Sequence, residues 1–439
     1  MANILIKPSN HTGGDNSDFV GMRFASESNQ PSVEAIFPLG YHYTSIGEDG
    51  KPVDAKAPEN QKALRKELFD LLGTIRTHSK SAAGTLEGVT NHLEEFPFDA
   101  YVTIVKAFMQ YGYYLESEVR YKNAPAGKIN WKRTIAQVKP TMQGDSAVYT
   151  DFIVRQVEKK TDKLISLIHE WCVYEAFTKI GWIFTAFNPN KPQLNIGEDE
   201  QERKYFIYVI QEALKTTFND RYKVLFKAMI QMLEHSRAEK KSAFFYGTTR
   251  FHAVWESLIN QAFGIDDIKK KEYFPPAKWH FVSPKQKDRS NKLYPDTIML
   301  HNNDVFVLDA KYYSFIVNCS VPAAADINKQ ITYGEYAHKK VNSKDKEKET
   351  EEKSKVYNAF IIPYDFKRDP YSLCGDIDNY IYIGYASLTD EKGQSQGEES
   401  YHKVLGVLVD TCWIMKNREM NMKVELASFI REKRVKAEE

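Results

Sequence analysis

The chain has 439 residues, enough for two or three domains, and 42% of them are hydrophobic, which excludes a collagen-like or wholly disordered protein. Its 60 Lys and Arg residues nearly balance 59 Asp and Glu residues, giving a net charge of +1. A chain-wide positive field that would hold any polyanion is therefore excluded, and binding to nucleic acid would require a local concentration of basic residues.

Cysteine usage and the N-terminal residues predict a cytoplasmic protein. The four cysteines lie far apart and form no CxxC pair, which argues against a zinc ribbon and against a disulfide scaffold. The first residues, MANILIKPSN, lack the apolar region of a signal peptide. The most apolar later stretch, 404–415, is too short to span a bilayer, so we expect no membrane association.

Residues 1–160 are predicted to form an N-terminal α+β domain. The first 30 residues are rich in Asn, Ser, Gly and Asp, and we expect them to be loosely held. Further along, apolar residues recur at helical spacing in some stretches, and β-branched and aromatic residues gather in others. The predicted elements are a strand at 33–43, helices at 59–75 and 97–111, and a hairpin of strands 113–121 and 128–135.

The remaining chain is divided into a helical connector at 161–241 and an α/β domain at 242–439. A charged insert near 338–355 has almost no apolar residue and is typical of a solvated or disordered loop. The elements predicted for the α/β domain are helices at 249–263 and 326–340, strands at 293–300, 305–313, 356–364, 379–388 and 401–415, and a terminal helix.

Acidic and basic side chains gather on two of these strands, which are joined by a short hairpin. Asp296 lies in the first strand, and Asp309 and Lys311 lie in the second. Because side chains alternate along a strand, Asp309 and Lys311 project from one face, and the hairpin brings Asp296 near both. Their neighbours are apolar, so these charges must be paired or bound to a metal ion.

A divalent cation is the natural compensation, because carboxylate oxygens suit Mg²⁺, which also binds phosphates. We predict that Asp296 and Asp309 hold Mg²⁺, with Mn²⁺ as a substitute, and that Lys311 orients or activates the attacking water. The chemistry is then metal-assisted hydrolysis of a phosphodiester bond. The alternative is a chance ion pair at the surface.

These residues resemble the PD-(D/E)xK nuclease superfamily, with PD at Pro295-Asp296 and DxK at 309–311. The resemblance implies a restriction-endonuclease-like core with a central mixed β-sheet flanked by helices. It also implies an acid on the preceding helix, which would be Glu256, acting as a metal ligand directly or through water. Gln330 and Tyr333, on the helix after the lysine strand, would support the site.

Each of these additional residues has a simpler interpretation. Glu256 could be an exposed acid on an amphipathic helix, and Gln330 and Tyr333 could serve only in helix capping or packing.

A narrower resemblance covers residues from about 95 to 365. The stretches FYGTTRFHAVWESL, YPDTIML, VFVLDAKYY and DINKQITYGEYA, with GKINWKRTI upstream, resemble the LlaJI-type restriction endonucleases, which are related to the McrC nuclease subunit. In one version such a subunit works with a separate McrB-like GTPase of the AAA+ class. The absence of a GxxxxGK[ST] motif from this sequence is compatible with that version.

Two segments concentrate basic residues. Residues 119–139 hold six Lys and Arg residues and no acid, with Tyr121 and Trp131 interleaved, and residues 269–292 hold seven Lys and one Arg against two acids. We predict that both contact DNA phosphates, although a solvated hairpin face is an equal alternative for the first. The predicted DNA-binding residues are Lys128, Lys132, Arg133, Lys285, Lys287, Arg289 and Lys292.

Taken together, the sequence predicts a Mg²⁺-dependent endonuclease of a restriction system for anti-phage defence, acting on double-stranded DNA. The N-terminal region would serve DNA recognition or partner docking. Alternatives are a cleavage subunit that depends on an AAA+ GTPase and, from a different class, a non-catalytic DNA-binding or assembly subunit. A palindromic recognition site would favour a homodimer through its twofold symmetry.

Overall fold

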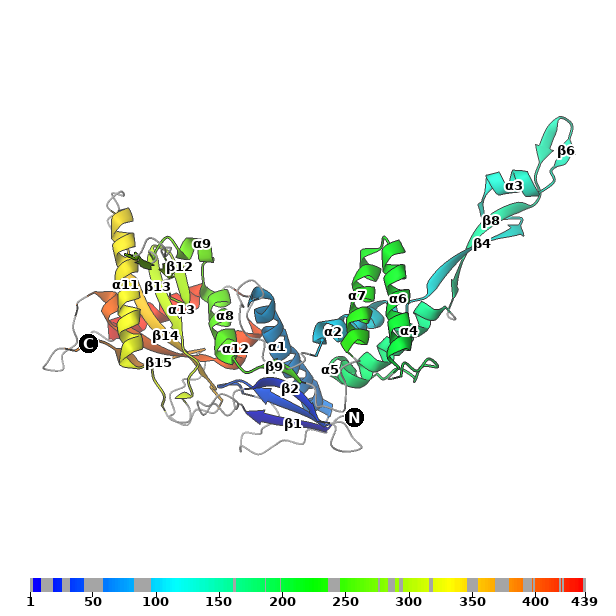
Figure 1. Ribbon diagram of the computed structural model, residues 1–439. Coiled ribbons are helices and arrows are strands. Elements are labelled where there is room, and N and C mark those ends of the chain that lie inside the picture. The colour runs from blue at the N-terminus through cyan, green and yellow to red at the C-terminus, as the bar shows by residue number, and fades with distance from the viewer. Residues whose placement is uncertain are drawn as a thin grey trace. The chain divides into compact units, whose positions relative to one another are not determined.

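A computed structural model shows how the predicted elements are arranged (Figure 1). The structure describes residues 3–8, 19–25, 32–42, 58–82, 96–160, 163–185, 187–197, 199–235, 245–274, 277–282, 289–291, 295–315, 319–345, 354–367, 379–389, 397, 399–417, 420 and 422–436.

Contacts between Cα atoms divide the chain into two compact units. One, which we call the inserted unit, comprises residues 93–244, and the other, the core unit, combines residues 2–92 with residues 245–439. This division differs from the three segments predicted at 1–160, 161–241 and 242–439, because the N-terminal residues group with the C-terminal ones.

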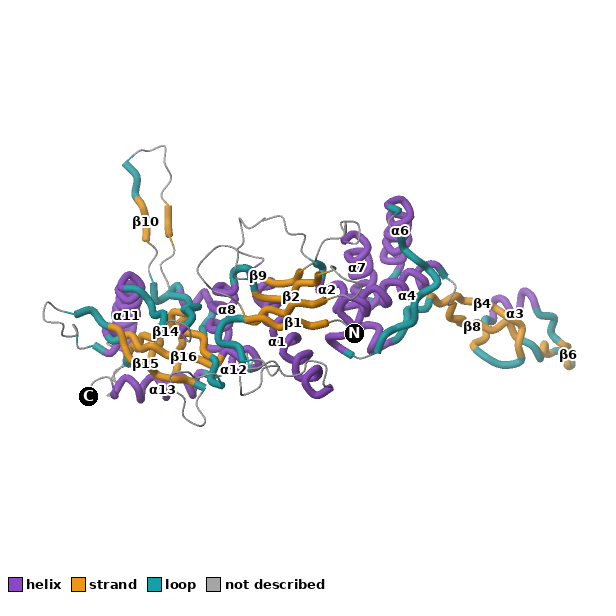
Figure 2. The backbone as a smooth tube through the Cα atoms, turned by 90° about the horizontal axis from the view of Figure 1, so that it is seen from below, coloured by secondary structure: helices purple, strands orange, loops and turns teal. Residues whose placement is uncertain are grey.

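A small sheet explains why the two ends of the chain share the core unit. Its strand order is β1-β3-β2-β9, with β1 and β3 parallel and the other pairs antiparallel, and Figure 2 labels β1, β2 and β9 in this sheet. The prediction of a loosely held N-terminal start is therefore wrong for the strands that it contains. The strands are β1 (Asn3–Pro8), β2 (Val20–Ala25), β3 (Ser32–Phe37) and β9 (Phe245–Thr248).

The second sheet of the core unit has five strands in the order β12-β13-β14-β16-β15. The three central strands are parallel to one another and both edge strands are antiparallel to their neighbours, so the predicted mixed sheet flanked by helices is confirmed. The strands are β12 (Thr297–His301), β13 (Asp304–Ala310), β14 (Val356–Tyr364), β15 (Tyr380–Ala386) and β16 (Val404–Asp410).

Burial of the central strand follows from cover on both faces of this sheet. All nine residues of β14 are buried, as expected for a strand with helices on both sides. On one face, Tyr333 of α11 (Ala324–Asp345) packs in a cluster with Val305 and Val307. On the opposite face, the Arg431 guanidinium of α13 (Lys423–Lys436) lies 5.4 Å from the centroid of the Phe306 ring.

Pro363 limits the pairing between β13 and β14. The last bond of this ladder runs from the Lys311 N–H to the Ile361 carbonyl oxygen, at 2.9 Å. The next residue of β14 that faces β13 is Pro363, which has no N–H to donate, so the chain leaves the sheet just after Lys311. The backbone after Lys311 is therefore no longer paired with β14.

The other elements of the core unit surround the two sheets. They are α1 (Pro58–Ala82), α8 (Phe251–Phe263), α9 (Asp267–Lys270), the paired strands β10 (Ala277–Trp279) and β11 (Arg289–Asn291), the 3₁₀ turn η2 (Ser400–His402) and α12 (Thr411–Lys416).

Two predictions for the core unit need correction. The predicted strand at 401–415 ends at Asp410, whose carboxylate accepts a hydrogen bond from the Trp413 N–H at 2.7 Å and so begins α12. The charged insert predicted as a loop at 338–355 is helical as far as Asp345, because α11 continues through it. Residues 346–353 lie outside the described residues.

The inserted unit combines a helical part with strands, and one predicted strand in it is wrong. Residues 131–137 form α3, which starts where the Asn130 side chain accepts the Arg133 N–H, so only β5 of the strand predicted at 128–135 remains. The long partner of β4 is β8. The elements are α2 (Phe98–Tyr111), β4 (Glu116–Ala124), β5 (Lys128–Ile129), α3 (Trp131–Gln137), β6 (Thr141–Gln143), β7 (Ser146–Val148), β8 (Phe152–Lys160), α4 (Leu164–Ala176), the π-helix η1 (Phe177–Gly181), α5 (Trp182–Phe184), α6 (Glu200–Thr216) and α7 (Asp220–His235).

No helix in the described parts of the chain is both long enough and apolar enough to cross a lipid bilayer.

Candidate functional site

The pairing of β12 with β13 brings two predicted catalytic acids together. Thr297 lies opposite Leu308 in the antiparallel ladder, so Asp296, one residue earlier, lies beside the end of β13. Its Oδ2 atom accepts a hydrogen bond from the Ala310 N–H at 3.2 Å. The Asp296 carboxylate is thus held beside the residue that separates Asp309 from Lys311.

A buried lysine fixes the backbone at the same point. Lys270 is only 3% exposed, and its Nζ atom donates to the Asp296 carbonyl oxygen at 2.7 Å. The same ammonium lies 3.4 Å from a carboxylate oxygen of Asp267. Lys270 belongs to the basic segment at 269–292, but here it holds the start of β12 and is not accessible to a phosphate.

Asp309 of β13 and Lys311, the first residue after β13, project to the same side, as the strand pattern predicted. The Lys311 Nζ atom lies 2.8 Å from Asp309 Oδ2 and also 2.8 Å from Asp326 Oδ1. Asp309 is 3% exposed, so its carboxylate is almost fully removed from water. The lysine therefore bridges a strand carboxylate and a carboxylate in the first turn of α11.

The acids of this cluster interact through their charges. Burial, followed by the nearby charges of Asp309 and Glu256, raises the pKa of Asp296 to about 7. Burial and then the charge of Asp309 also raise the pKa of Glu256. Such shifts mark a site where negative charge is concentrated and incompletely compensated.

Lys311 remains a cation in this environment. Burial opposes the charged form of its ammonium, but the hydrogen bonds to Asp309 and Asp326 outweigh burial and raise the pKa of Lys311 above its usual value. For Asp326, burial favours the neutral acid, but the hydrogen bond from Lys311 prevails and lowers the pKa of Asp326. Near neutral pH the pair is therefore an ammonium and a carboxylate.

Glu256 is positioned by its neighbour on α8. The Trp255 side chain is fully buried, and its indole N–H donates to the Ile361 carbonyl oxygen of β14 at 3.2 Å. Glu256 is half-buried, which differs from the exposed acid of the simpler interpretation. Among the described residues, no three His, Cys, Asp or Glu side chains are grouped closely enough to hold a metal ion by themselves.

Gln330 and Tyr333 fix α11 to the sheet. Gln330 is 1% exposed, and its Nε2 atom donates to the Val307 carbonyl oxygen of β13 at 2.8 Å. The Tyr333 ring is 3% exposed and packs edge-on against Phe274 at 5.5 Å between centroids. Both side chains lie in the packed interface that holds the start of α11 near Lys311.

Sequence reasoning missed two charged residues of this site, Asp326 and Lys329. Asp326 precedes Gln330 by four positions and Lys329 precedes Tyr333 by four, so all four residues lie on one side of α11. The positive charge of Lys329 favours the ionised forms of Asp296 and Glu256. The helical spacing around Gln330 and Tyr333 was the available signal for both.

The family model for the LlaJI restriction endonuclease matches residues 56–389, which is most of the chain and includes every residue of this cluster. The chain belongs to the LlaJI restriction endonuclease family.

This LlaJI-family chain is similar to a curated protein and was also matched to a solved assembly. The chain is 26% identical over 293 residues to the type II restriction enzyme BsuMI component YdjA of Bacillus subtilis, a match that covers 63% of this chain and 60% of that protein. A chain in a solved assembly of Thermococcus gammatolerans McrB AAA+ hexamers with bound McrC was also matched, with 13% identity and a TM-score of 0.31. The match covers 93% of this chain and 83% of the solved chain. A TM-score this low carries no argument about a shared fold.

The predicted DNA-binding residues of the LlaJI-family chain fall in different units. Lys128, Lys132 and Arg133 are exposed in the inserted unit, and the Arg133 guanidinium lies 4.0 Å from the centroid of the Tyr121 ring. Arg289 opens β11 in the core unit. Lys285, Lys287 and Lys292 lie outside the described residues.

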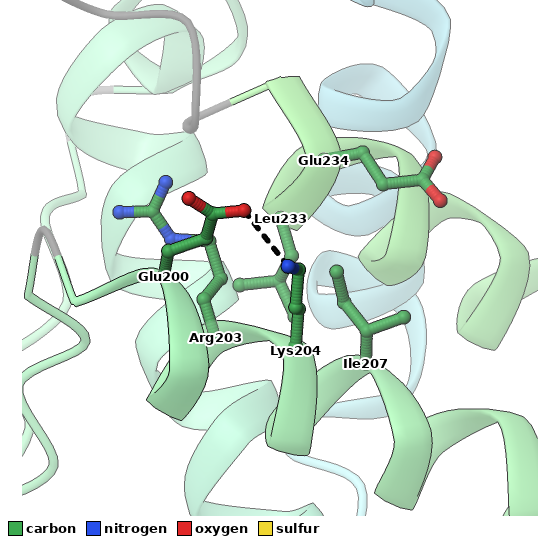
Figure 3. Close-up of a pocket in the computed structure, with 6 residues that line it drawn as sticks. All are labelled: Glu200, Arg203, Lys204, Ile207, Leu233 and Glu234. Atoms are coloured by element: carbon green, nitrogen blue, oxygen red, sulfur yellow. Dashed lines mark ion pairs between the residues drawn. The ribbon is translucent and has the colours of Figure 1, made fainter.

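A cavity of about 450 Å³ lies between α6 and α7 of the inserted unit (Figure 3). Two acidic and two basic side chains line it, and one of each, Glu200 and Lys204, form an ion pair at 2.9 Å. This balance of charge selects neither an anionic nor a cationic ligand, and the cavity contains none of the predicted catalytic residues. Its lining residues are Glu200, Arg203, Lys204, Ile207, Leu233 and Glu234.

Proposed function

We propose that this LlaJI-family protein is a Mg²⁺-dependent endonuclease that hydrolyses phosphodiester bonds in double-stranded DNA as part of a restriction system. The observation that carries the proposal is the cluster at the ends of β12 and β13. There two carboxylates, Asp296 and Asp309, share a half-buried site with the Lys311 ammonium. This donor set and this spacing are what the PD-(D/E)xK resemblance implies.

The donor set fits a hard divalent cation. Asp309 already binds a positive charge, the Lys311 ammonium at 2.8 Å, and the raised pKa of Asp296 indicates that further positive charge would be stabilising. Mg²⁺ is commonly held by one or two carboxylates, with waters and substrate phosphates completing its shell, so a closed set of three protein ligands is not required. Asp296 and Asp309 would hold it, and Glu256 would act through water. When bound, Mg²⁺ supplies a water of lowered pKa and neutralises charge on the phosphate.

The chain's own residues then divide the remaining tasks. Because the Lys311 ammonium stays protonated near neutral pH, it serves to orient the attacking water and to stabilise negative charge on the scissile phosphate. Gln330 and Tyr333 contribute indirectly, by keeping α11 packed on β13. Lys270 keeps the backbone of Asp296 in place.

The test is cleavage of plasmid DNA by the Lys311→Ala variant. We expect cleavage in Mg²⁺ to fall by at least about 10²-fold, the usual cost of removing a preorganised charge from a transition state, while DNA binding is retained. Lys339→Ala is the matched control, because Lys339 lies on the exposed side of α11 in a surface pair with Glu335. Undiminished cleavage by Lys311→Ala would contradict the proposed function.

A second version of the function makes this chain the cleavage subunit of an assembly driven by a separate AAA+ GTPase. The name of the B. subtilis relative, a component of a restriction enzyme, favours an assembly of several subunits. The purified protein incubated with plasmid and Mg²⁺ alone distinguishes the versions, since discrete fragments would support a self-sufficient enzyme. Cleavage only with an AAA+ partner and GTP would support the second version. No cleavage under either condition would support a non-catalytic subunit.

A further inference from the structure

The Lys311 ammonium is bound to the Asp309 carboxylate, which a metal ion would also bind. Its Nζ atom lies 2.8 Å from Asp309 Oδ2, at the distance of a charge-assisted hydrogen bond. Under the proposed function, on which this inference rests, a divalent cation arriving at Asp309 meets a positive charge already bound to that oxygen. Two cations on one carboxylate repel each other strongly, so binding of the metal at Asp309 favours a Lys311 ammonium that has moved away from that carboxylate.

Asp326 offers the ammonium another partner within reach. Its Oδ1 atom lies 2.8 Å from the same Nζ atom, while its Oδ2 atom accepts a hydrogen bond from the Ala323 N–H at 3.3 Å. The carboxylate sits in the first turn of α11, where the partial positive charge of the helix end favours an anion. Lys311 can therefore lose its bond to Asp309 and keep a charged partner.

Asp326 is attached to a fixed element, whereas Lys311 has a flexible side chain. The Gln330 side chain holds α11 to the Val307 carbonyl oxygen of β13 at 2.8 Å. The Asn358 side chain of β14 donates to the Gln330 carbonyl oxygen at 3.0 Å and is itself 1% exposed. The part of this contact that can shift when a metal ion arrives is the four-carbon chain of Lys311.

The charges of the cluster agree with this exchange. Asp296, Asp309 and Asp326 carry three negative charges when ionised and Lys311 carries one positive charge, so a single divalent cation neutralises the set. Glu256 and Lys329 have opposite charges and interact with each other. Without Asp326, the divalent cation and the Lys311 ammonium would compete for only two carboxylates.

We propose that Asp326 is a positioning residue that receives the Lys311 ammonium when a divalent cation binds at Asp309, and thereby makes that carboxylate available. Removing its charge would leave Lys311 with Asp309 as its remaining charged partner in the bridge. The cation would then have to displace the ammonium without compensation.

The test measures binding of the metal ion alone to the full chain, without DNA, by calorimetry with Mg²⁺ and by the electron paramagnetic resonance signal of Mn²⁺. We expect Asp326→Asn to weaken the affinity by about 10- to 100-fold, the usual effect of changing the surroundings of a metal ligand. Asp326→Ser, whose hydroxyl can still accept the Ala323 N–H, should weaken it similarly. Asp220→Asn is the control, since Asp220 lies in the first turn of α7 and pairs with a lysine at the surface.

A second background distinguishes positioning from direct ligation. In Lys311→Met the competing ammonium is absent, so metal affinity should rise and Asp326→Asn should weaken binding much less than it does in the parent chain. If Asp326→Asn weakens binding equally in both backgrounds, Asp326 is a ligand of the metal and the proposal is overturned. If Asp326→Asn alone binds the metal as tightly as the parent chain does, the proposal also fails, while the proposed function stands. If the parent chain binds neither ion, the proposed function fails as well.

Discussion

Within the candidate site, the ionisation of Asp296 depends strongly on the fold. Burial and the charges of Asp309 and Glu256 raise its pKa from an ordinary value near 3.8 to about 7. Between these two values the folded protein binds a proton that the unfolded chain has lost. The contribution of Asp296 to stability is therefore largest at low pH and is lost as pH rises from about 4 to 7.

Replacing Asp296 by Asn should stabilise the metal-free protein at pH 8 and change it little at pH 5. At pH 8 the substitution removes a buried charge, and at pH 5 the wild-type carboxyl is already neutral. The unfolding midpoint measured by thermal denaturation in EDTA should rise by a few degrees at pH 8, because about 1 kcal/mol shifts the midpoint of a domain of roughly 150–250 residues by about 2–4 °C. Exposed Asp145 provides the control substitution Asp145→Asn. Equal shifts at both pH values would show that the change acts through packing.

For single residues, the sequence predicted which side chains the hairpin of β12 and β13 brings together. Asp309 and Lys311 follow from alternation along β13, and Asp296 follows from the hairpin between β12 and β13. The turn at the hairpin was also predicted correctly, and Asn302 there adopts a positive φ of 55°. Lys270 and Asp326 could not be assigned in the same way, because each reaches the site through the packing of a different helix.

Among the elements, α11 controls the geometry of the site, and Gly334 sets how closely it approaches the sheet. A Cβ atom at position 334 would lie 2.6 Å from Asn358 Nδ2 and 2.7 Å from the Tyr401 Cβ. The Asn358 amide also donates to the Tyr401 carbonyl oxygen at 2.7 Å. The absence of a side chain at Gly334 therefore permits the contact that holds α11 beside β14.

Gly334→Ala should destabilise the protein although alanine is the better helix former. The gain in helix propensity is about 1 kcal/mol, whereas overpacking against a fixed neighbour costs about 1–3 kcal/mol and would also disturb the Asn358 hydrogen bonds. The comparison is the urea midpoint of this variant against Gly197→Ala, a position where an added Cβ meets nothing within 4 Å. A midpoint for Gly334→Ala above that of the parent chain would contradict the close packing of α11.

Elements were predicted well where one pattern dominated. The apolar run at 356–364 predicted β14 at its observed bounds, because a central strand is buried on both faces. The errors at 128–135 and 401–415 share one cause, a side chain that caps a helix inside a stretch predicted as a strand. Asn130 begins α3 and Asp410 begins α12, and neither capping bond could be distinguished by hydrophobic pattern from a continuing strand.

For the whole molecule, the pairing of distant segments was beyond local pattern. Strand β2 pairs with β9, so residues 20–23 pair with residues 245–248 although the whole inserted unit lies between them in the sequence. Composition and periodicity report on neighbours along the chain and contain no signal for such a pairing. The sequence did show that the net charge of +1 conceals local basic segments, and the exposed lysines of the inserted unit agree with that.

Whether those lysines bind DNA can be decided from the salt dependence of affinity. If Lys128 and Lys132 each neutralise one phosphate, the double substitution to Ala should weaken binding to duplex DNA at low salt. It should also reduce the slope of log affinity against log salt by about 2, because each contact releases close to one counterion. The measurement is fluorescence anisotropy of a labelled duplex in EDTA, which prevents cleavage.

The control for this prediction is Lys227→Ala, which removes an exposed charge from α7 in the same unit. If only the total positive charge matters, Lys227→Ala should change the slope as much as a single substitution at Lys128 or Lys132 does. If Lys128 and Lys132 contact phosphates directly, Lys227→Ala should keep the slope of the parent chain. If the double variant keeps both the affinity and the slope of the parent chain, the basic residues of β5 and α3 form a solvated surface, and that unit serves another partner.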